Sequence, residues 1–231
     1  MGTALVRSKR TLAAAAVVAA VLVLGGLSLV GVGDAGAASK KSSAAKVSDA
    51  TMSWAVSAYV LTPNVATLSV AEVQNAEAPA TFTAGTGWEF TDGTGTYDPK
   101  TGATTLEFTG ALEFGNTSRG DYGFKIANPS LVLDKTGTGT LSADVSLRAA
   151  GGAPFGTATK TVVVDVTGAS PEATKKHVDI AVTPTAFAAP FLAAVGELAS
   201  HFQASGSSND ANKPPAPIAV AFDYKAKKAK S

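Results

Sequence analysis

Residue types that could do chemistry are scarce in this chain, which has no cysteine and two histidines, His177 and His201. The missing cysteines exclude disulfides, thiolate metal sites, Cys nucleophiles and iron–sulfur clusters. A His-rich zinc site cannot be built from two imidazoles alone. No G-x-S-x-G sequence points to a serine hydrolase, and nothing pairs Glu107 with Glu113 across a cleft, as a glycosidase requires. These residues favour a protein that is not an enzyme.

Charge excludes a further class of partner. The chain of 231 residues has 19 basic and 18 acidic side chains, which gives a formal net charge of +1. A balance so close to neutral produces no strong field over the molecule. We therefore expect no nucleic-acid partner.

The N-terminus is predicted to be an export signal. Three basic residues, Arg7, Lys9 and Arg10, precede an uncharged run at 12–32 that is mostly Ala, Val, Leu and Gly. The Ala-Gly-Ala sequence at 35–37 forms a small-residue cleavage signal, so residues 1–37 are predicted to be a signal peptide that contacts the membrane only during export. The alternative is an uncleaved N-terminal membrane anchor, because the run is about long enough to span the ~30 Å core of a bilayer. In both cases the remainder is expected to be secreted or associated with the cell surface.

The exported part is expected to form one domain between two polar segments. Residues 38–46 are small, polar and basic, which is typical of a flexible linker. Residues 47–224 are enough for a domain that buries a substantial core. The basic tail at 225–231 has no apolar residue pattern that would hold it to the domain.

Two helices are predicted within the domain. The first is a short N-terminal helix between Ser48 and Pro63, based on the helical spacing of Met52, Val56, Tyr59 and Val60. The second lies near 190–203, where Pro190 suits a first helical position. Its apolar stripe consists of Phe191, Val195, Leu198 and Phe202.

Most of the remaining domain is typical of short β-strands. Thr, Val, Leu and Phe alternate with polar residues, and turns are expected where Gly, Asn, Asp and Pro gather, as at Asp92-Gly93 and Asn128-Pro129. This pattern predicts a mainly β fold, a two-sheet antiparallel β-sandwich. The expected strands are 80–90, 104–114, 122–126, 131–133, 139–147, 158–167, 177–183 and 218–222.

An ordered set of motifs resembles a known family, the HtaA domain of exported haem-acquisition proteins of Gram-positive bacteria. Trp54 matches the opening Trp of that domain, and the resemblance covers about residues 50–224. The motifs are Gly93–Gly102 (GTGTYDPKTG), Phe108–Phe114 (FTGALEF), Asn128–Leu133 (NPSLVL) and Gly137–Val145 (GTGTLSADV).

The resemblance implies a β-rich domain that binds haem and passes it along a cell-surface relay in iron acquisition. Its partners would be haem, haem-carrying proteins and other relay proteins. In the family, a Tyr shortly after the opening Trp ligates the iron. Tyr59 is its counterpart here, about one helical turn early, and Pro63 occupies the usual place. A phenolate is a competent ligand for ferric haem.

Other family positions depart from the pattern. The His expected just after the FTGALEF strand is missing, because the turn reads Gly-Asn-Thr-Ser at 115–118, and Phe202 stands where a Tyr would. His201 is the remaining residue that could hydrogen-bond a ligand or the tyrosinate. The haem-binding residues implied are therefore Tyr59, as the metal ligand, and His201.

Less specific roles remain open for the same residues. Tyr59 could simply pack its ring on the sheet with its hydroxyl exposed to solvent. His201 and His177 could be exposed surface residues. Trp54 and Trp88 could stack on a porphyrin or belong to the core. The alternative function is an HtaA-like cell-surface binding or structural module that has lost the haem site.

Overall fold

Among the residues that the structure describes, twelve antiparallel strands account for most of the domain, which confirms the mainly β prediction. The computed structural model describes residues 44–61, 73–116, 122–149, 151–174, 176–204, 206 and 210–225. The predicted signal peptide therefore lies outside the described residues. The strands are β1 (Ala45–Trp54), β2 (Val73–Glu77), β3 (Thr81–Thr83), β4 (Gly87–Tyr97), β5 (Thr104–Glu107), β6 (Ala111–Asn116), β7 (Tyr122–Leu133), β8 (Gly139–Arg148), β9 (Thr159–Val166), β10 (Ser170–Ala173), β11 (His177–Val182) and β12 (Ile218–Lys225).

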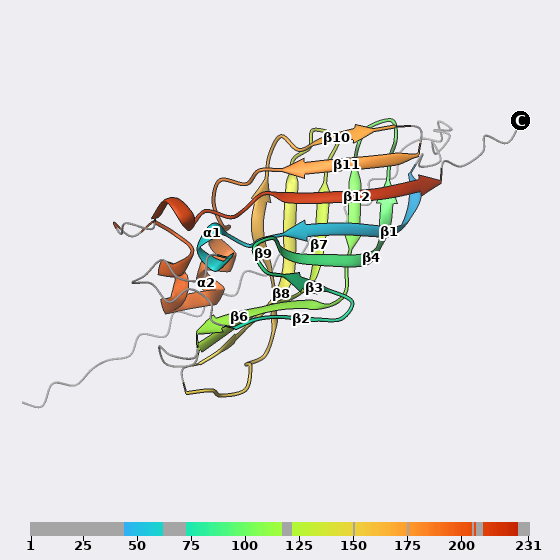
Figure 1. The fold of residues 1–231 in the computed structure, drawn as a ribbon. Helices are drawn as coiled ribbons and strands as arrows, with labels where there is room; N and C mark the ends of the chain where they lie inside the picture. Colours follow the sequence, from blue (N-terminus) through green and yellow to red (C-terminus); the bar gives the residue numbers. More distant parts are fainter. Residues whose placement is uncertain are drawn as a thin grey trace, which may run out of the picture. The chain divides into compact units, whose positions relative to one another are not determined.

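The strands form two crossed layers that are joined into one hydrogen-bonded sheet. The main path runs β10-β11-β12-β1-β4-β5-β7-β6-β2, with β3 on β4 and with β8 and β9 continuing from β7. In Figure 1 the strands β10, β11, β12 and β1 run across the view, whereas β7, β8 and β9 run at a steep angle to them. Strand β7 pairs with β5 through its second half and with β6 through its first half. The expected sandwich is thus a continuous sheet that folds over on its own core.

Two expected turns are bulges inside long strands. Asp92 lies within β4 at φ 57° and Asn128 within β7 at φ 49°. The strand register shifts beside each of them, between Ala50 and Met52 and between Ala127 and Ser130. Asp and Asn tolerate this left-handed backbone better than most residues. The sequence therefore indicated correctly an irregular backbone at both positions, but the chain bends there and does not reverse.

The predicted N-terminal helix is wrong over most of its length. Residues 45–54 form β1, which pairs with β12 on one side and with β4 on the other. Among the described residues of this range, a single turn, α1 (Ala58–Leu61), is helical. The two flanking strands supply hydrogen bonds along β1, and this tertiary pairing overrides a helical spacing that rested on four apolar positions. β1 also begins inside the range 38–46 that was expected to be a linker, with Ala45 buried.

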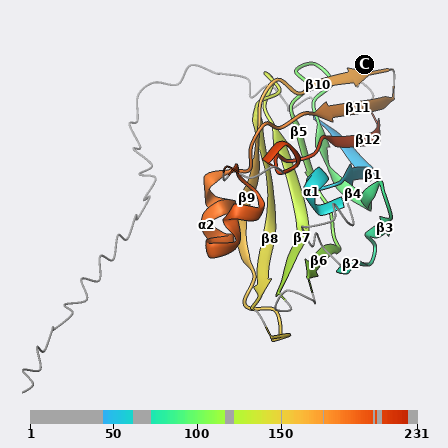
Figure 2. The same ribbon diagram turned by 60° about the vertical axis from the view of Figure 1, so that its left-hand side comes forward.

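The second helix is confirmed in place. It consists of α2 (Ala189–Val195) with Pro190 in its first turn, followed by a 3₁₀ segment η1 (Gly196–His201). Figure 2 shows α2 against β9 and β8. Phe191 and Val195 are buried, and so is Phe202, the residue directly after η1. A second 3₁₀ turn, η2 (Asp210–Asn212), precedes β12. Within the described residues, no helix is long and apolar enough to cross a membrane.

Candidate functional site

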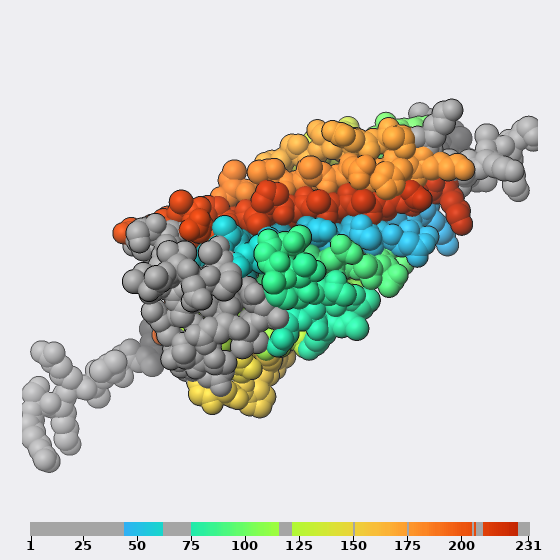
Figure 3. Space-filling model, viewed as in Figure 1, coloured from blue at the N-terminus to red at the C-terminus, as the bar shows by residue number. Residues whose placement is uncertain are grey.

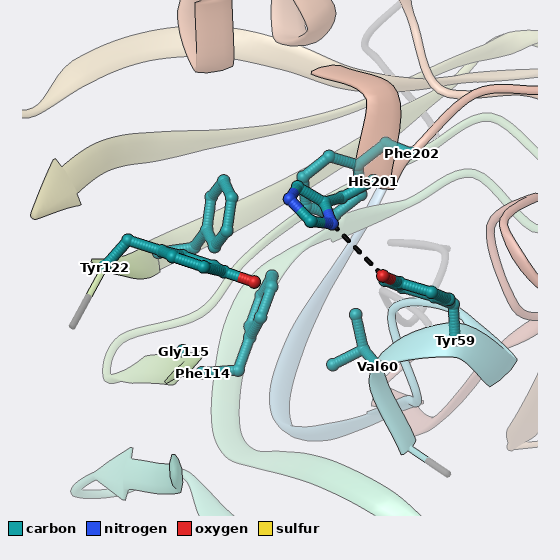
Figure 4. Close-up of a pocket in the computed structure, with 8 residues that line it drawn as sticks. Tyr59, Val60, Phe114, Gly115, Tyr122, His201 and Phe202 are labelled. Atoms are coloured by element: carbon teal, nitrogen blue, oxygen red, sulfur yellow. Dashed lines mark hydrogen bonds between the residues drawn. The ribbon is translucent and has the colours of Figure 1, made fainter. Parts of the chain in front are cut away.

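Tyr59 and His201 meet at one end of the domain, although they lie far apart in the sequence. The phenol oxygen of Tyr59 is 3.2 Å from Nδ1 of His201. The two ring centroids are 5.9 Å apart. Both side chains are partly exposed, so solvent reaches the pair. Figure 4 shows the contact at the edge of a pocket whose other walls are mostly aromatic.

Local backbone contacts fix the direction of Tyr59. The chain leaves β1 through Val56, a buried residue at φ 61°. Ser57 then starts the turn of α1, since its hydroxyl accepts a hydrogen bond from the Val60 N–H at 3.3 Å. The Ala216 N–H donates to the Val56 carbonyl at 2.8 Å, which ties this turn to the segment before β12. A polar residue at the start of a helical turn satisfies an otherwise unpaired N–H.

His201 is held in place by the residue that follows it. Phe202 is 2% exposed. Its ring meets Phe187, Phe191, Phe114 and Phe124 edge on, at centroid distances of 5.0 to 6.1 Å. The Phe202 N–H also donates to the Ala199 carbonyl at 2.9 Å, which closes the 3₁₀ turn. Burial of Phe202 therefore leaves His201 on the outer side, facing Tyr59.

The hairpin of β6 and β7 forms the floor of the pocket. Phe114 and Phe124 are cross-strand neighbours with stacked rings 5.0 Å apart. Tyr122, two residues before Phe124 on the same strand face, has its ring 5.5 Å from the ring of His201. Gly115 lies between these residues, where any side chain would collide with the backbone of Tyr122. A glycine at this position lets β6 and β7 approach closely under the pocket.

The enclosed space in the pocket is small. Its volume is about 20 Å³, which holds little more than one water molecule. Binding pockets for small molecules typically measure about 300–1,000 Å³. Among the described lining residues most surfaces are apolar, and the polar side-chain groups are those of Tyr59, Tyr122 and His201. The lining residues are Tyr59, Val60, Phe114, Gly115, Tyr122, Phe124, His201 and Phe202.

The side chains gathered here are of the types that would hold a flat, apolar ligand with a hard metal ion. When the His201 proton is on Nε2, Nδ1 accepts a hydrogen bond from the Tyr59 hydroxyl. If a metal ion bound the Tyr59 oxygen in place of its proton, this imidazole could receive the proton. A phenolate can ligate ferric haem, and aromatic walls suit a porphyrin face. The donor set therefore fits haem, whereas the hollow of about 20 Å³ between these side chains is much smaller than a porphyrin.

The other residues singled out in the sequence lie elsewhere. Trp54 and Trp88 are cross-strand partners on β1 and β4, 2% and 1% exposed, so they belong to the core. His177 is on the outer face of β11, where Nδ1 contacts Asp223 at 2.7 Å and Nε2 contacts Asp179 at 3.3 Å. Glu113 pairs with Arg148 at 3.7 Å. In the described part of the chain, no three His, Asp or Glu side chains gather as a metal site.

Sequence reasoning missed Tyr122. Its signal was available, because Tyr122 and Phe124 alternate at the start of an expected strand. The pairing of Phe114 with Phe124 could not be read from the sequence, and this pairing brings the face of β7 that carries Tyr122 under His201.

Comparison with known proteins decides the family. The family model of HtaA matches residues 49–198. The chain belongs to the HtaA family. This family is associated with haem uptake and is not a known enzyme family. A search of curated proteins found no match to this HtaA-family chain.

Two solved structures share the HtaA fold. The C-terminal domain of HtaA from Corynebacterium glutamicum has a TM-score of 0.60 at 17% identity, covering 78% of this chain and 99% of that one. A domain-swapped dimer of a His-to-Ala variant of the same domain has a TM-score of 0.51 at 16% identity, covering 66% of this chain and 83% of that one. Identities this low establish a shared fold alone.

Proposed function

We propose that this HtaA domain binds ferric haem at the pocket between α1, η1 and the β6–β7 hairpin, as a non-catalytic step of iron acquisition at the cell surface. The observation that carries the proposal is the 3.2 Å contact between the Tyr59 hydroxyl and His201 Nδ1 over aromatic walls. Membership of a family associated with haem uptake supports it.

Tyr59 is the proposed iron ligand, and His201 is the proposed proton partner. Bound haem would supply the ferric ion, which favours the phenolate over the phenol. His201 orients the Tyr59 oxygen before binding and holds the phenol proton or its hydrogen bond afterwards. In this way His201 takes the part of the family histidine that is missing from the turn at 115–118. Phe114, Phe124 and Phe202, which line the pocket, would keep water away from a bound porphyrin.

Hemin titration of the purified protein tests the proposal. A saturable shift of the Soret band is expected for the wild type. Tyr59→Phe keeps the ring and its packing but removes the oxygen, so the shift should be lost. His201→Gln keeps a hydrogen-bonding side chain but cannot take up a proton, so affinity should fall by about tenfold or more. A tenfold loss of affinity corresponds to about 1.4 kcal/mol of binding free energy.

Tyr122→Phe and Tyr224→Phe are the matched controls. Tyr122 lines the same pocket, and Tyr224 is buried on β12 outside it. Both variants should titrate like the wild type. A Soret shift that survives Tyr59→Phe but disappears in Tyr122→Phe would assign the ligand to Tyr122 and overturn the role given to Tyr59.

The alternative is a cell-surface binding or structural module without haem. One observation favours it, the enclosed volume of about 20 Å³. A wild type that shows no saturable Soret shift, while remaining folded by circular dichroism, would support this alternative. If haem does bind, transfer to or from haem-carrying proteins and other surface relay proteins follows as the proposed role, and it can be measured by mixing haem-loaded protein with an apo acceptor.

A further inference from the structure

The segment before β12 contacts the start of α1. This segment, which we call the strap, consists of residues 210–217, begins with η2 and leads into β12. Pro215 forms an isolated antiparallel bridge with Ser57, and the Ala216 N–H donates to the carbonyl of the residue before Ser57 at 2.8 Å. Figure 3 shows the cyan residues of α1 against the red chain that leads into β12. The strap therefore holds the start of the helical turn that carries Tyr59.

The position of this turn decides where the Tyr59 oxygen lies. The Tyr59 side chain is partly exposed, so burial does not lock it in place. Its ring contact among the described residues is with His201, and 3.2 Å separates its hydroxyl from His201 Nδ1. A shift of α1 by about 1 Å away from η1 would take these two atoms out of hydrogen-bond range. The contact therefore requires that α1 stays where the strap holds it.

Lys213 is buried in the strap, and its charge is paired there. Lys213 is 5% exposed and is the buried lysine among those that the structure describes. Its Nζ lies 2.9 Å from Oδ1 of Asp210, while Oδ2 of the same carboxylate accepts a hydrogen bond from the Gly206 N–H at 2.7 Å. Lysine is almost never buried unless it is paired. The ion pair thus closes the strap two residues before Pro215, which contacts α1.

Stability alone is a poor explanation for this ion pair. Removing two charges from water costs about as much free energy as their attraction returns, so replacing a buried pair by apolar residues is often neutral. In some proteins a buried ionic or polar group instead restricts the chain to one conformation. The conformation restricted here is that of the strap, whose next residues contact the turn of Tyr59.

We propose that the Asp210–Lys213 ion pair positions the Tyr59 oxygen, through the strap and α1, for ligation of the haem iron. Neither residue lines the pocket, so both are positioning residues that act through α1. This inference rests on the proposed function for its purpose, but the positioning itself can be measured without haem. Without the ion pair, Tyr59 faces His201 in only a fraction of the molecules. The apparent affinity for hemin falls in proportion to that fraction.

The double variant Asp210→Asn with Lys213→Met tests the positioning. Asn keeps an acceptor for the Gly206 N–H and Met keeps an apolar stem, so the melting temperature should stay close to that of the wild type. In the protein without haem, the nuclear Overhauser effect between the ring protons of Tyr59 and His201 should weaken. Hemin affinity should fall about tenfold if the aligned state falls to about a tenth of the molecules.

Glu77→Gln with Lys125→Met is the matched control, because it neutralises a more exposed ion pair between β2 and β7. It should leave both the Overhauser effect and the hemin affinity unchanged. An Overhauser effect that is unchanged in the strap variant, or equally weakened in both double variants, would overturn the inference. A strap variant that does not fold would also overturn it, since the pair would then serve stability. If the wild type binds no hemin, the proposed function fails, and the Overhauser effect still decides whether the pair positions Tyr59.

Discussion

The ring of Phe202 meets the ring of Phe124 edge on, with 5.1 Å between centroids and 88° between planes. Phe202 comes from the end of η1, and Phe124 from β7 on the far side of the pocket. This contact joins the His201 segment to the sheet.

Loss of the Phe202 ring should destabilise the domain severely. Phe202→Ala is expected to cost about 3–5 kcal/mol, because it leaves a cavity among four other phenylalanines. Chemical denaturation monitored by circular dichroism measures the effect. Phe155→Ala is the control, since that ring is partly exposed and has Arg148 5.3 Å from its centroid. A cost near 1 kcal/mol is expected there. Similar costs for both variants would contradict the account of Phe202.

The two core tryptophans should respond differently to the same substitution. The Trp88 indole N–H donates to the Asn75 carbonyl at 2.7 Å, whereas the Trp54 indole N–H is buried without a partner among the described residues. Trp88→Phe loses a hydrogen bond that Trp54→Phe does not lose. We therefore expect Trp88→Phe to be the less stable variant by about 0.5–1.5 kcal/mol in urea denaturation. The reverse order would show that the Trp54 N–H has a partner in the folded protein.

His177 gives the domain a defined pH dependence. The hydrogen bond to the Asp223 carboxylate raises the pKa of His177 above its ordinary value of 6.5. Because the pKa of His177 is higher in the folded protein than in the unfolded chain, protonated His177 stabilises the fold. This contribution is complete below about pH 6.5 and is lost as the pH rises through the folded-state pKa. The stability difference between wild type and His177→Gln should therefore shrink from pH 6 toward pH 9.

The Asp223→Asn variant isolates the cause of this shift. Without the carboxylate, the pKa of His177 followed by NMR should fall toward its ordinary value, with Asp179 supplying the smaller remaining effect. An unchanged titration in Asp223→Asn would exclude the Asp223 contact as the cause.

Because β7 and β8 approach each other closely, alanine substitutions at two glycines should differ sharply in their effect on stability. A side chain at Gly139 would collide with the Val132 carbonyl, whereas at Gly156 the nearest atom is the Leu147 carbonyl oxygen, 3.5 Å away. Gly139→Ala should cost about 1–3 kcal/mol through backbone displacement. Gly156→Ala should change stability by less than about 1 kcal/mol. Equal melting temperatures for the two variants would show that the strands separate without cost.

Sequence patterns predicted the strands well where apolar and polar residues largely alternate along the chain. β8, β9, β11 and β12 begin and end within a few residues of their expected positions. Sequence failed at β1 because Met52, Val56, Tyr59 and Val60 also fit a helical spacing, and the pairing of β1 with β12 and β4 overrides it. The bulges at Asp92 and Asn128 were mistaken for turns. A residue with left-handed backbone can reverse the chain or only bend it, and the strands that pair on either side decide which of the two occurs.

The candidate site was predicted in part. Tyr59 and His201 were named from the resemblance and from their residue types, and the structure brings them within 3.2 Å. Their roles toward haem stay a prediction. Tyr122 and the aromatic floor were missed, because the pocket is made by segments that join only through the fold.

The cross-strand pairing of Lys46 with Lys225 also decides how the domain responds to mechanical force. Its first and last described strands are neighbours and leave at the same end. A pull that separates these two exits would load the hydrogen bonds between β1 and β12 one pair after another, as a zipper opens, and not all at once. Traction on the flanking segments would thus peel β12 from the sheet before the pocket at the other end of β1 is disturbed.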